Sequence, residues 1–193
     1  HWLLTDCFDV FYVTTAGVEL HKLMPQQNGL KLVKSVGHVV VGYTYSHANR
    51  LVLLATGERG NTIVGLQIPQ SGSGLLKLTK FDLDMAPSQS LSDNFGPSAM
   101  SSSLAPGECV GSSRLFLVQL YDHLYCCHAN PLTRRLQLHR MSRDRAVELR
   151  VFEAALVSQG RVAVSVVDNL LLIHDIGMQV TTLFDIKGGG SAT

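Results

Sequence analysis

Residues 162–174, with the sequence VAVSVVDNLLLIH, are followed shortly by VTTLFDIK at residues 180–187. Short apolar runs rich in β-branched residues and bounded by turn-forming residues are typical of β-strands. Asp168-Asn169 lies between the first two runs, and Ile176-Gly177-Met178 lies between the second and the third. Asp and Asn tolerate the backbone angles of tight turns. This part of the chain therefore predicts three consecutive antiparallel strands.

The same pattern recurs from one end of the sequence to the other, and helical periodicity is scarce. Turn-forming residues separate the apolar runs. The expected strands fall into four groups along the chain: residues 8–14, 18–23 and 30–36; residues 39–45, 51–55, 63–68 and 75–83; residues 114–120, 124–128, 135–141 and 147–152; and the three strands after residue 161. The sequence therefore predicts an all-β protein.

The second group of strands suggests how the sheets are arranged. Its apolar content falls from the first strand to the fourth, where Lys77, Thr79 and Lys80 alternate with leucines. Such a gradient from buried to half-exposed is expected from the axial strand to the rim of one propeller blade. We therefore expect about half of a WD40-like β-propeller made of antiparallel four-stranded sheets. Gly-His occurs once, at Gly37-His38, and Trp-Asp does not occur, so there is no repeated Gly-His and Trp-Asp signature. A β-sandwich and a jelly roll therefore remain alternatives.

The domain organisation follows from a change in composition. Residues 1–187 are expected to form the propeller fragment, with a Ser/Pro/Gly-rich loop at 85–113 that contains at most one strand, near residues 108–111. Residues 188–193, which include three consecutive glycines, are expected to form a flexible tail. Because no initiating Met, basic leader or cleavage site precedes the first strand, we interpret the chain as a fragment.

Composition and charge restrict the classes of partner. The 193 residues contain 16 Lys and Arg against 15 Asp and Glu, a net charge of +1. Such a balance predicts no long-range attraction to nucleic acid or to anionic lipid. No apolar run approaches the roughly 18 to 20 residues that a membrane-spanning helix needs. The four cysteines lack the spacing of a disulfide framework and no Asn-x-Ser/Thr site is present, which favours a reducing, cytosolic setting.

The segment His123-Leu124-Tyr125-Cys126-Cys127-His128 is the first candidate for a metal site. Alternate residues of a strand face opposite sides, so Cys126 and His128 share a face and Cys127 points away. His139 is a possible neighbour across the sheet. A structural zinc ion needs four ligands, and only two converge here. We therefore expect buried thiols, and neither a metal nor another cofactor.

The sequence supports a catalytic site even less than it supports a metal site. Asp168-Asn169, and Asp82 with Asp84, are the candidate carboxylate pairs for acid–base chemistry, but the first pair is better explained as a turn. No Gly-x-Ser-x-Gly motif is present, and the glycine-rich segments lack the lysine of a phosphate-binding loop. We therefore predict no catalytic residues, no small-molecule substrate and no enzymatic activity. A hydrolase would need one Ser or Asp whose replacement abolishes turnover and leaves the fold intact.

Arginines provide the one concentration of basic residues, and they comprise Arg134, Arg135, Arg140, Arg143, Arg145 and Arg150. Because no aromatic residue occurs between Tyr125 and Phe152, platforms for stacking single-stranded bases are absent. A solvated surface is the expected explanation. A contact patch for an acidic partner or for phosphoinositide headgroups is the alternative.

Two parts of the sequence carry a resemblance to a known family. Residues 166–174 with 183–187, and residues 10–14, 17–20 and 30–35 in the same order and spacing, resemble the N-terminal β-propeller of the Bulli or Mic-one family. Its members are described as regulators of the Mon/Ccz exchange factor. The resemblance covers nearly the whole chain and is weakest from residue 85 to residue 114, where this sequence has its own Ser-rich insertion.

The resemblance implies a non-enzymatic scaffold subunit, in which this chain is the C-terminal part of a propeller that precedes a helical solenoid. It implies binding to the Mon/Ccz heterodimer, which loads GTP on the late-endosomal Rab in endosome-to-lysosome traffic and autophagy. It also implies a cytoplasmic protein, peripherally associated with late-endosomal and lysosomal membranes. A propeller subunit of another vesicle coat or tethering complex is the alternative. The sequence does not predict which residues contact the partner.

Overall fold

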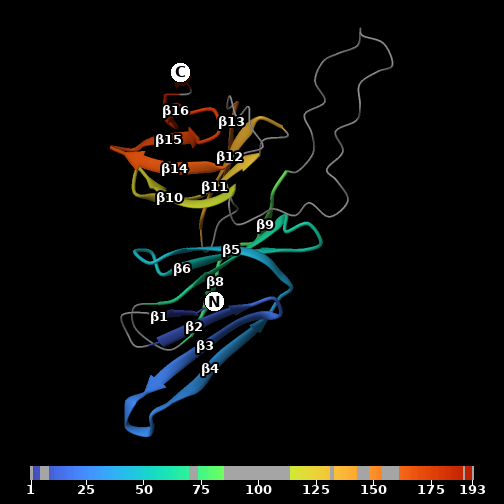
Figure 1. Ribbon diagram of the computed structural model, residues 1–193, viewed down its shortest axis with the longest axis vertical. Helices are drawn as coiled ribbons and strands as arrows, with labels where there is room; N and C mark the ends of the chain where they lie inside the picture. The colour runs from blue at the N-terminus through green and yellow to red at the C-terminus, as the bar shows by residue number, and fades with distance from the viewer. Residues whose placement is uncertain are drawn as a thin grey trace.

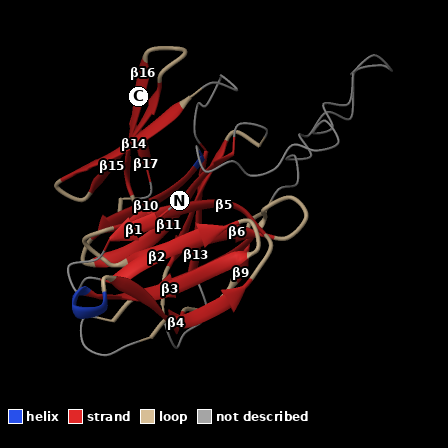
Figure 2. Ribbon diagram, turned by 60° about the horizontal axis from the view of Figure 1, so that its bottom comes forward, coloured by secondary structure: helices blue, strands red, loops and turns tan. Residues whose placement is uncertain are grey.

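The structure is a computed structural model that describes residues 2–4, 9–69, 74–84, 114–130, 133–142, 148–153, 161–188 and 190–192 (Figure 1). Its strands are β1 (Trp2–Leu4), β2 (Asp9–Thr14), β3 (Gly17–Met24), β4 (Gly29–Gly37), β5 (Val40–Ser46), β6 (Leu51–Thr56), β7 (Thr62–Gln67), β8 (Leu76–Lys77), β9 (Phe81–Asp82), β10 (Leu115–Leu120), β11 (His123–Asn130), β12 (Arg135–Arg140), β13 (Glu148–Glu153), β14 (Val162–Val167), β15 (Leu170–Asp175), β16 (Val180–Asp185) and β17 (Gly190–Ala192). One 3-10 turn, η1 (Pro25–Gln27), joins β3 to β4 (Figure 2), and the described residues contain no α-helix.

The strands form four separate antiparallel sheets, none of which closes into a barrel. We number the sheets in chain order. The first sheet has the order β1-β2-β3-β4, the second β5-β6-β7-β8 with β9 also paired to β7, the third β10-β11-β12-β13, and the fourth β14-β15-β16-β17. The predicted all-β class and the antiparallel four-stranded organisation of three sheets are thus confirmed. The second sheet has five strands.

Figure 1 shows the four sheets following one another along the long axis, from the first at the bottom to the fourth at the top. Strand β6 explains this stacking, because all six of its residues are buried. Val52 and Leu54 pack toward the first sheet, while Leu51, Leu53 and Ala55 pack toward the third. A strand with two apolar faces is stable only when sheets cover both of them.

Three apolar cores join neighbouring sheets, and each draws on strands from both sides. The first and second sheets share a core around Phe11, Leu20 and Leu54. The second and third share one around Leu53, Ile63 and Leu115. The third and fourth sheets share a core that includes Leu120, Leu136, Leu138, Leu171, Ile173 and Phe184. Each fully buried side chain of this size contributes roughly 1.5 to 3 kcal/mol to stability.

The first strands of the last three sheets lie side by side, because β10 contacts both β5 and β14.

Among the described residues, no helix is long and apolar enough to span a bilayer.

The predicted burial gradient of the second group is wrong in its first strand. Only Val40 of β5 is buried, and its other residues are half-buried or exposed, whereas β6 is buried throughout. The reason is position in the sheet. Strand β5 is an edge strand, while β6 has a partner on each side and a sheet against each face.

Three strand boundaries also differ from the expectation. Strand β1 adds a fourth strand to the first sheet, and β17 lies within the expected flexible tail and pairs with β16, which gives the fourth sheet four strands instead of three. Residues 75–83 form two short strands, β8 and β9. Between them Leu78 packs over Gly65, where an added Cβ would lie 3.1 Å from the leucine. The expected loop at 85–113, with its possible strand at 108–111, lies outside the described residues.

Candidate interaction surface

The metal candidates lie together at the interface between the second and third sheets. Cys126 is directly opposite His139, and His128 is directly opposite Gln137, so all four share one face of β11 and β12. Cys127 points to the opposite face, as predicted, where it enters the core shared with the fourth sheet. Among the residues that the structure describes, no group of three potential metal ligands is close enough to hold an ion. Cys7 and Cys109 lie outside them.

Burial sets the protonation of the two histidines and of both cysteines. The pKa of His128 falls to about 4, first because desolvation disfavours an imidazolium and second because nearby His139 disfavours a further positive charge. Burial lowers the pKa of His139 to about 4 as well. Burial raises the pKa of the Cys127 thiol to about 12, and burial followed by the charge of Cys127 raises the pKa of Cys126. At neutral pH the two imidazoles and the Cys126 thiol of this interface are uncharged, and so is the Cys127 thiol on the opposite face. Protonated thiols are unreactive.

Polar contacts at the same interface tie the second sheet to the third. The Gln137 amide donates to the carbonyl oxygen of Asp84 at 2.8 Å, and Asn130 donates to the same oxygen at 3.4 Å. The ring of Phe81 stacks on His139 with 4.3 Å between ring centroids. Three buried atoms have no partner among the described residues: His128 Nδ1, His139 Nε2 and Gln137 Oε1. This interface therefore combines apolar packing with a polar cluster.

The carboxylate candidates have separate structural roles. Asp168 and Asn169 have φ angles of 48° and 69°, so they form the predicted turn. The Asn169 side chain accepts a hydrogen bond from the Tyr121 backbone N–H at 2.5 Å, which links the third and fourth sheets. Asp82 accepts from Thr62 at 2.6 Å. Asp84 contributes the backbone oxygen described above. These contacts are structural, and they do not place either pair of side chains for acid–base chemistry.

A second link between the third and fourth sheets involves Tyr121. Its hydroxyl donates to Asp185 at 2.8 Å, and the Lys187 ammonium lies 3.9 Å from the centre of its ring. The Lys187 N–H and then the Tyr121 hydroxyl lower the pKa of Asp185 by hydrogen bonding to its carboxylate. These residues stabilise the junction of two sheets.

The sequence did not reveal one row of hydrogen-bonded side chains. Ser165 is 2.8 Å from Nε2 of His174, whose Nδ1 is 2.9 Å from the Thr181 hydroxyl. The first contact has the spacing of a nucleophile and its base, but the position of the orienting carboxylate is taken by a threonine. The three side chains lie in a row on the outer face of the fourth sheet. Alternation along the strands could have placed them on one face, although strand register could not have been foreseen.

Arg135, Arg140 and Arg150, three of the described arginines, have different neighbours. Arg135 and Arg140 are opposite Glu153 and Glu148 in the register of β12 and β13, so acidic residues lie beside them. Arg150 donates to the Ile186 carbonyl at 2.6 Å. Arg143 and Arg145 lie outside the described residues. This dispersal is consistent with the expected solvated surface.

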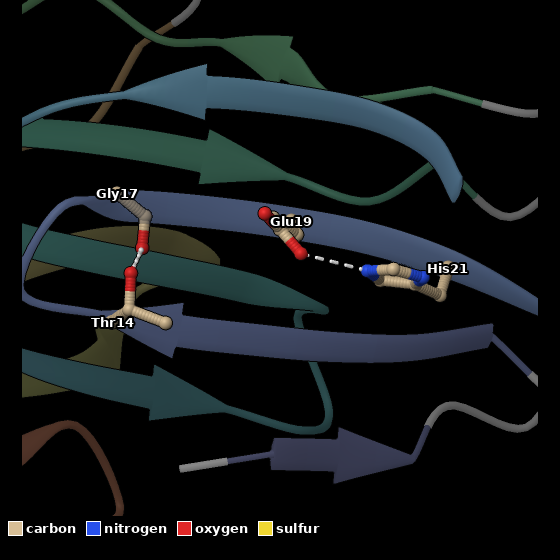
Figure 3. A network of polar contacts seen from close by, with 4 residues as sticks. All are labelled: Thr14, Gly17, Glu19 and His21. Carbon is tan, nitrogen blue, oxygen red and sulfur yellow. Dashed lines mark hydrogen bonds and ion pairs between the residues drawn. The ribbon is translucent and has the colours of Figure 1, made fainter. Parts of the chain in front are cut away.

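The outer face of the first sheet carries a small polar network (Figure 3). Glu19 and His21 project from β3, and their side chains are joined by a hydrogen bond of 2.9 Å between Oε2 and Nε2. The ring of Tyr12 meets that of His21 edge-on at 5.1 Å. At the turn between β2 and β3, the Thr14 hydroxyl donates to the Gly17 carbonyl at 3.2 Å. No described sheet packs against this face.

Two hairpins are among the places where exposed apolar side chains lie close together. In the β3–β4 hairpin, Leu30 and Leu32 are 44% and 52% exposed. In the β15–β16 turn, Ile176, Met178 and Val180 are 46% to 54% exposed. A groove of about 480 Å³ also lies between the end of β2 and the start of β5, lined by residues 13–15 and 40–43. Exposed apolar clusters of this kind are common where proteins bind other proteins.

The chain is similar to two curated proteins. The mouse and human proteins named "Regulator of MON1-CCZ1 complex" are each 26% identical to it, over 186 and 183 residues. Each alignment covers 95% of this chain. The chain spans about a quarter of the length of these relatives, 26% in each case.

No family model matches the sequence. Among solved structures, a Bacteroides uniformis protein described as a "putative 6-phosphogluconolactonase" superposes with a TM-score of 0.55 at 10% identity. The match covers 99% of this chain and 52% of that one, and at such low identity it indicates a shared fold alone. By sequence, the chain is thus similar along nearly its whole length to regulators of the MON1-CCZ1 complex.

Proposed function

We propose that this chain is part of a non-enzymatic scaffold that binds the MON1-CCZ1 complex. One observation carries the proposal: two curated regulators of that complex align with 95% of the chain. The structure is compatible with a binding role, because stacked sheets hold the exposed hairpins on a rigid support. Binding residues are commonly carried on loops that such a scaffold positions.

The four sheets are proposed to be about half of a β-propeller. Neighbouring sheets pack face to face, and the first strands of the last three sheets lie side by side, as they would around a common axis. The match to about half of a larger solved chain is in keeping with this arrangement. Further sheets would then cover the outer faces of the first and fourth.

In this proposal the exchange chemistry belongs to the partners. The scaffold stabilises or positions MON1-CCZ1 and thereby supports GTP loading of the late-endosomal Rab, in endosome-to-lysosome traffic and autophagy. It is cytoplasmic and reaches late-endosomal and lysosomal membranes peripherally, through its partner. It uses no cofactor, small-molecule substrate or nucleic acid.

A pull-down with the full-length protein tests the proposal. Purified MON1-CCZ1 is compared with an unrelated endosomal tethering complex and a coat complex at equal concentrations. We expect selective capture of MON1-CCZ1, and we expect the scaffold alone to release no nucleotide from the Rab. Capture of the tether or coat complex instead would favour the alternative scaffold, and nucleotide release by the scaffold alone would contradict its non-enzymatic role.

A further inference from the structure

The third sheet has two buried faces of different composition. One face packs against the fourth sheet through apolar side chains, among them Cys127, Leu136 and Leu138. The other face packs against the second sheet, and four of its buried side chains are polar: His128, Asn130, Gln137 and His139. We call these four residues the polar face of the third sheet. The composition of the two faces therefore distinguishes the second sheet from the fourth as a neighbour.

The polar face is matched to one short segment of the second sheet. The Gln137 amide donates to the Asp84 carbonyl oxygen at 2.8 Å, and the Asn130 amide donates to the same oxygen at 3.4 Å. The ring of Phe81 stacks on His139. Phe81 belongs to β9, and Asp84 follows that strand directly after one further residue. All three contacts therefore depend on β9 and the residues that follow it.

Apolar faces do not distinguish one neighbour from another in this way. Hydrophobic attraction is non-directional, so one apolar sheet face can pack on many others. Strand β6 illustrates this, because Leu54 contributes to the core with the first sheet and Leu53 to the core with the third. Similar units within one chain are prone to incorrect assembly. Apolar packing alone therefore does not fix which sheet lies beside the third.

A wrong neighbour would leave the polar face without its hydrogen bonds. The core side chains of the fourth sheet include Leu171, Ile173 and Phe184, which cannot accept a hydrogen bond. If they lay in the place of β9, the Gln137 amide would be buried without the Asp84 oxygen. A buried amide that lacks a partner destabilises the interface that contains it. The polar face therefore disfavours a neighbour that offers no such acceptor.

We propose that the polar face of the third sheet fixes the order in which the sheets stack, because it favours the second sheet as its neighbour and disfavours apolar sheet faces. Gln137 makes the larger contribution, since its bond to the Asp84 oxygen is shorter than that of Asn130. The inference concerns how the fold assembles. It goes beyond the proposed function and does not depend on which complex the scaffold binds.

An apolar substitution separates this role from a simple contribution to stability. Met is close to Gln in length, and its flexible side chain adapts to a buried site. Asp84 is an exposed residue, and its carbonyl oxygen keeps the hydrogen bond from Asn130. Gln137→Met should therefore preserve the correct stack and remove the penalty on a wrong one.

Two adjacent thiols report on the two faces of the third sheet separately. Cys126 lies in the core shared with the second sheet and Cys127 in the core shared with the fourth, and both are fully buried. Labelling of Cys126 by a maleimide therefore reports loss of the second sheet, and labelling of Cys127 reports loss of the fourth. Tandem mass spectrometry of the labelled peptide assigns the site.

The test compares full-length wild type with Gln137→Met and with the matched control Leu138→Met, which lies on the opposite face of β12. Each protein is labelled directly after cell-free synthesis, and again after its monomer has been isolated. Directly after synthesis, Gln137→Met should show about tenfold more labelled Cys126 than wild type, equivalent to about 1.4 kcal/mol, while Cys127 stays protected. Leu138→Met should match wild type. In the isolated monomers, both thiols should be protected in all three proteins.

Three results would overturn the inference. Equal labelling of Cys126 in newly made wild type and Gln137→Met would show that the amide does not discriminate between neighbours. Equal labelling of both thiols in newly made Gln137→Met would indicate general misfolding instead of a wrong neighbour. Labelling of Cys126 in the isolated Gln137→Met monomer would show that the amide stabilises the correct stack and does not select it.

Discussion

The interface between the second and third sheets differs in kind from the one between the third and fourth. The latter is an apolar core around Phe184 and Leu171. The former places His128, His139 and Gln137 against aliphatic and aromatic groups, and three of their polar atoms have no described partner. The two interfaces use the same strand pattern. Their comparison shows that similar sheets can be joined by buried groups that titrate in acid or by apolar packing that does not.

The largest expected effect breaks the apolar interface. Phe184 is fully buried, so Phe184→Ala should lower the free energy of unfolding by about 3 to 5 kcal/mol through lost burial and a residual cavity. Urea denaturation followed by fluorescence measures this change. Val167→Ala, at a position 54% exposed on the same sheet, is the control and should cost under about 0.5 kcal/mol. A cost below about 1 kcal/mol for Phe184→Ala would show that the sheets do not pack as described.

The next expected effect is that acid weakens the interface between the second and third sheets, which contains the buried histidines. Folded His128 and His139 have pKa values of about 4, against 6.5 for a free histidine. Between these values the unfolded chain binds more protons, so stability is full above pH 6.5 and is lost as the pH falls toward 4. Each histidine should contribute a slope of about 1.4 kcal/mol per pH unit within this window.

Denaturation between pH 7 and 4.5 checks this slope, with the double variant His128→Gln, His139→Gln as the comparison. The variant should show a clearly flatter dependence whatever its stability at pH 7. Parallel curves for the two proteins would mean that these histidines are not buried as neutral groups.

A smaller effect concerns the junction at Asn169. Asn169→Gly keeps the left-handed turn and removes the acceptor for the Tyr121 N–H. The expected cost is about 1 kcal/mol, measured by thermal unfolding, together with faster hydrogen exchange at Tyr121. Unchanged exchange at that amide would show that the bond does not form in solution.

The smallest expected effect is a change in titration at the same junction. Tyr121→Phe removes one hydrogen bond to Asp185 and leaves the Lys187 N–H in place. The pKa of Asp185 should therefore rise part of the way toward its ordinary value. Carbon-detected NMR titration of the carboxyl group checks the direction. A pKa that stays the same or falls would contradict the contact.

Much of the fold could be predicted because alternation in the sequence reports strands directly. The turn at Asp168-Asn169 and the opposite orientations of Cys126 and Cys127 follow from backbone geometry alone. Short strands such as β17 could not be found, since Gly190–Ala192 has no apolar pattern and is defined by pairing with β16. The burial predicted for β5 was wrong, because the sequence of one strand does not show whether that strand lies at the edge or in the middle of its sheet.

The site was less predictable than the fold for the same reason. Sequence placed Cys126 and His128 on one face and suggested His139 as a neighbour. It could not show that Phe81 stacks on His139 or that Gln137 binds the Asp84 carbonyl. The Ser165–His174 contact likewise depends on register between strands. Contacts between residues distant in the chain require the tertiary structure.

An experimental structure of the full-length protein tests the central claim most directly. The account predicts that the first strands of the four sheets line one axis and that further sheets cover the outer faces of the first and fourth. The polar cluster of His128, Gln137 and His139 should lie between two adjacent blades. Outer faces of the first and fourth sheets packed against each other as a sandwich, or covered by helices, would contradict it.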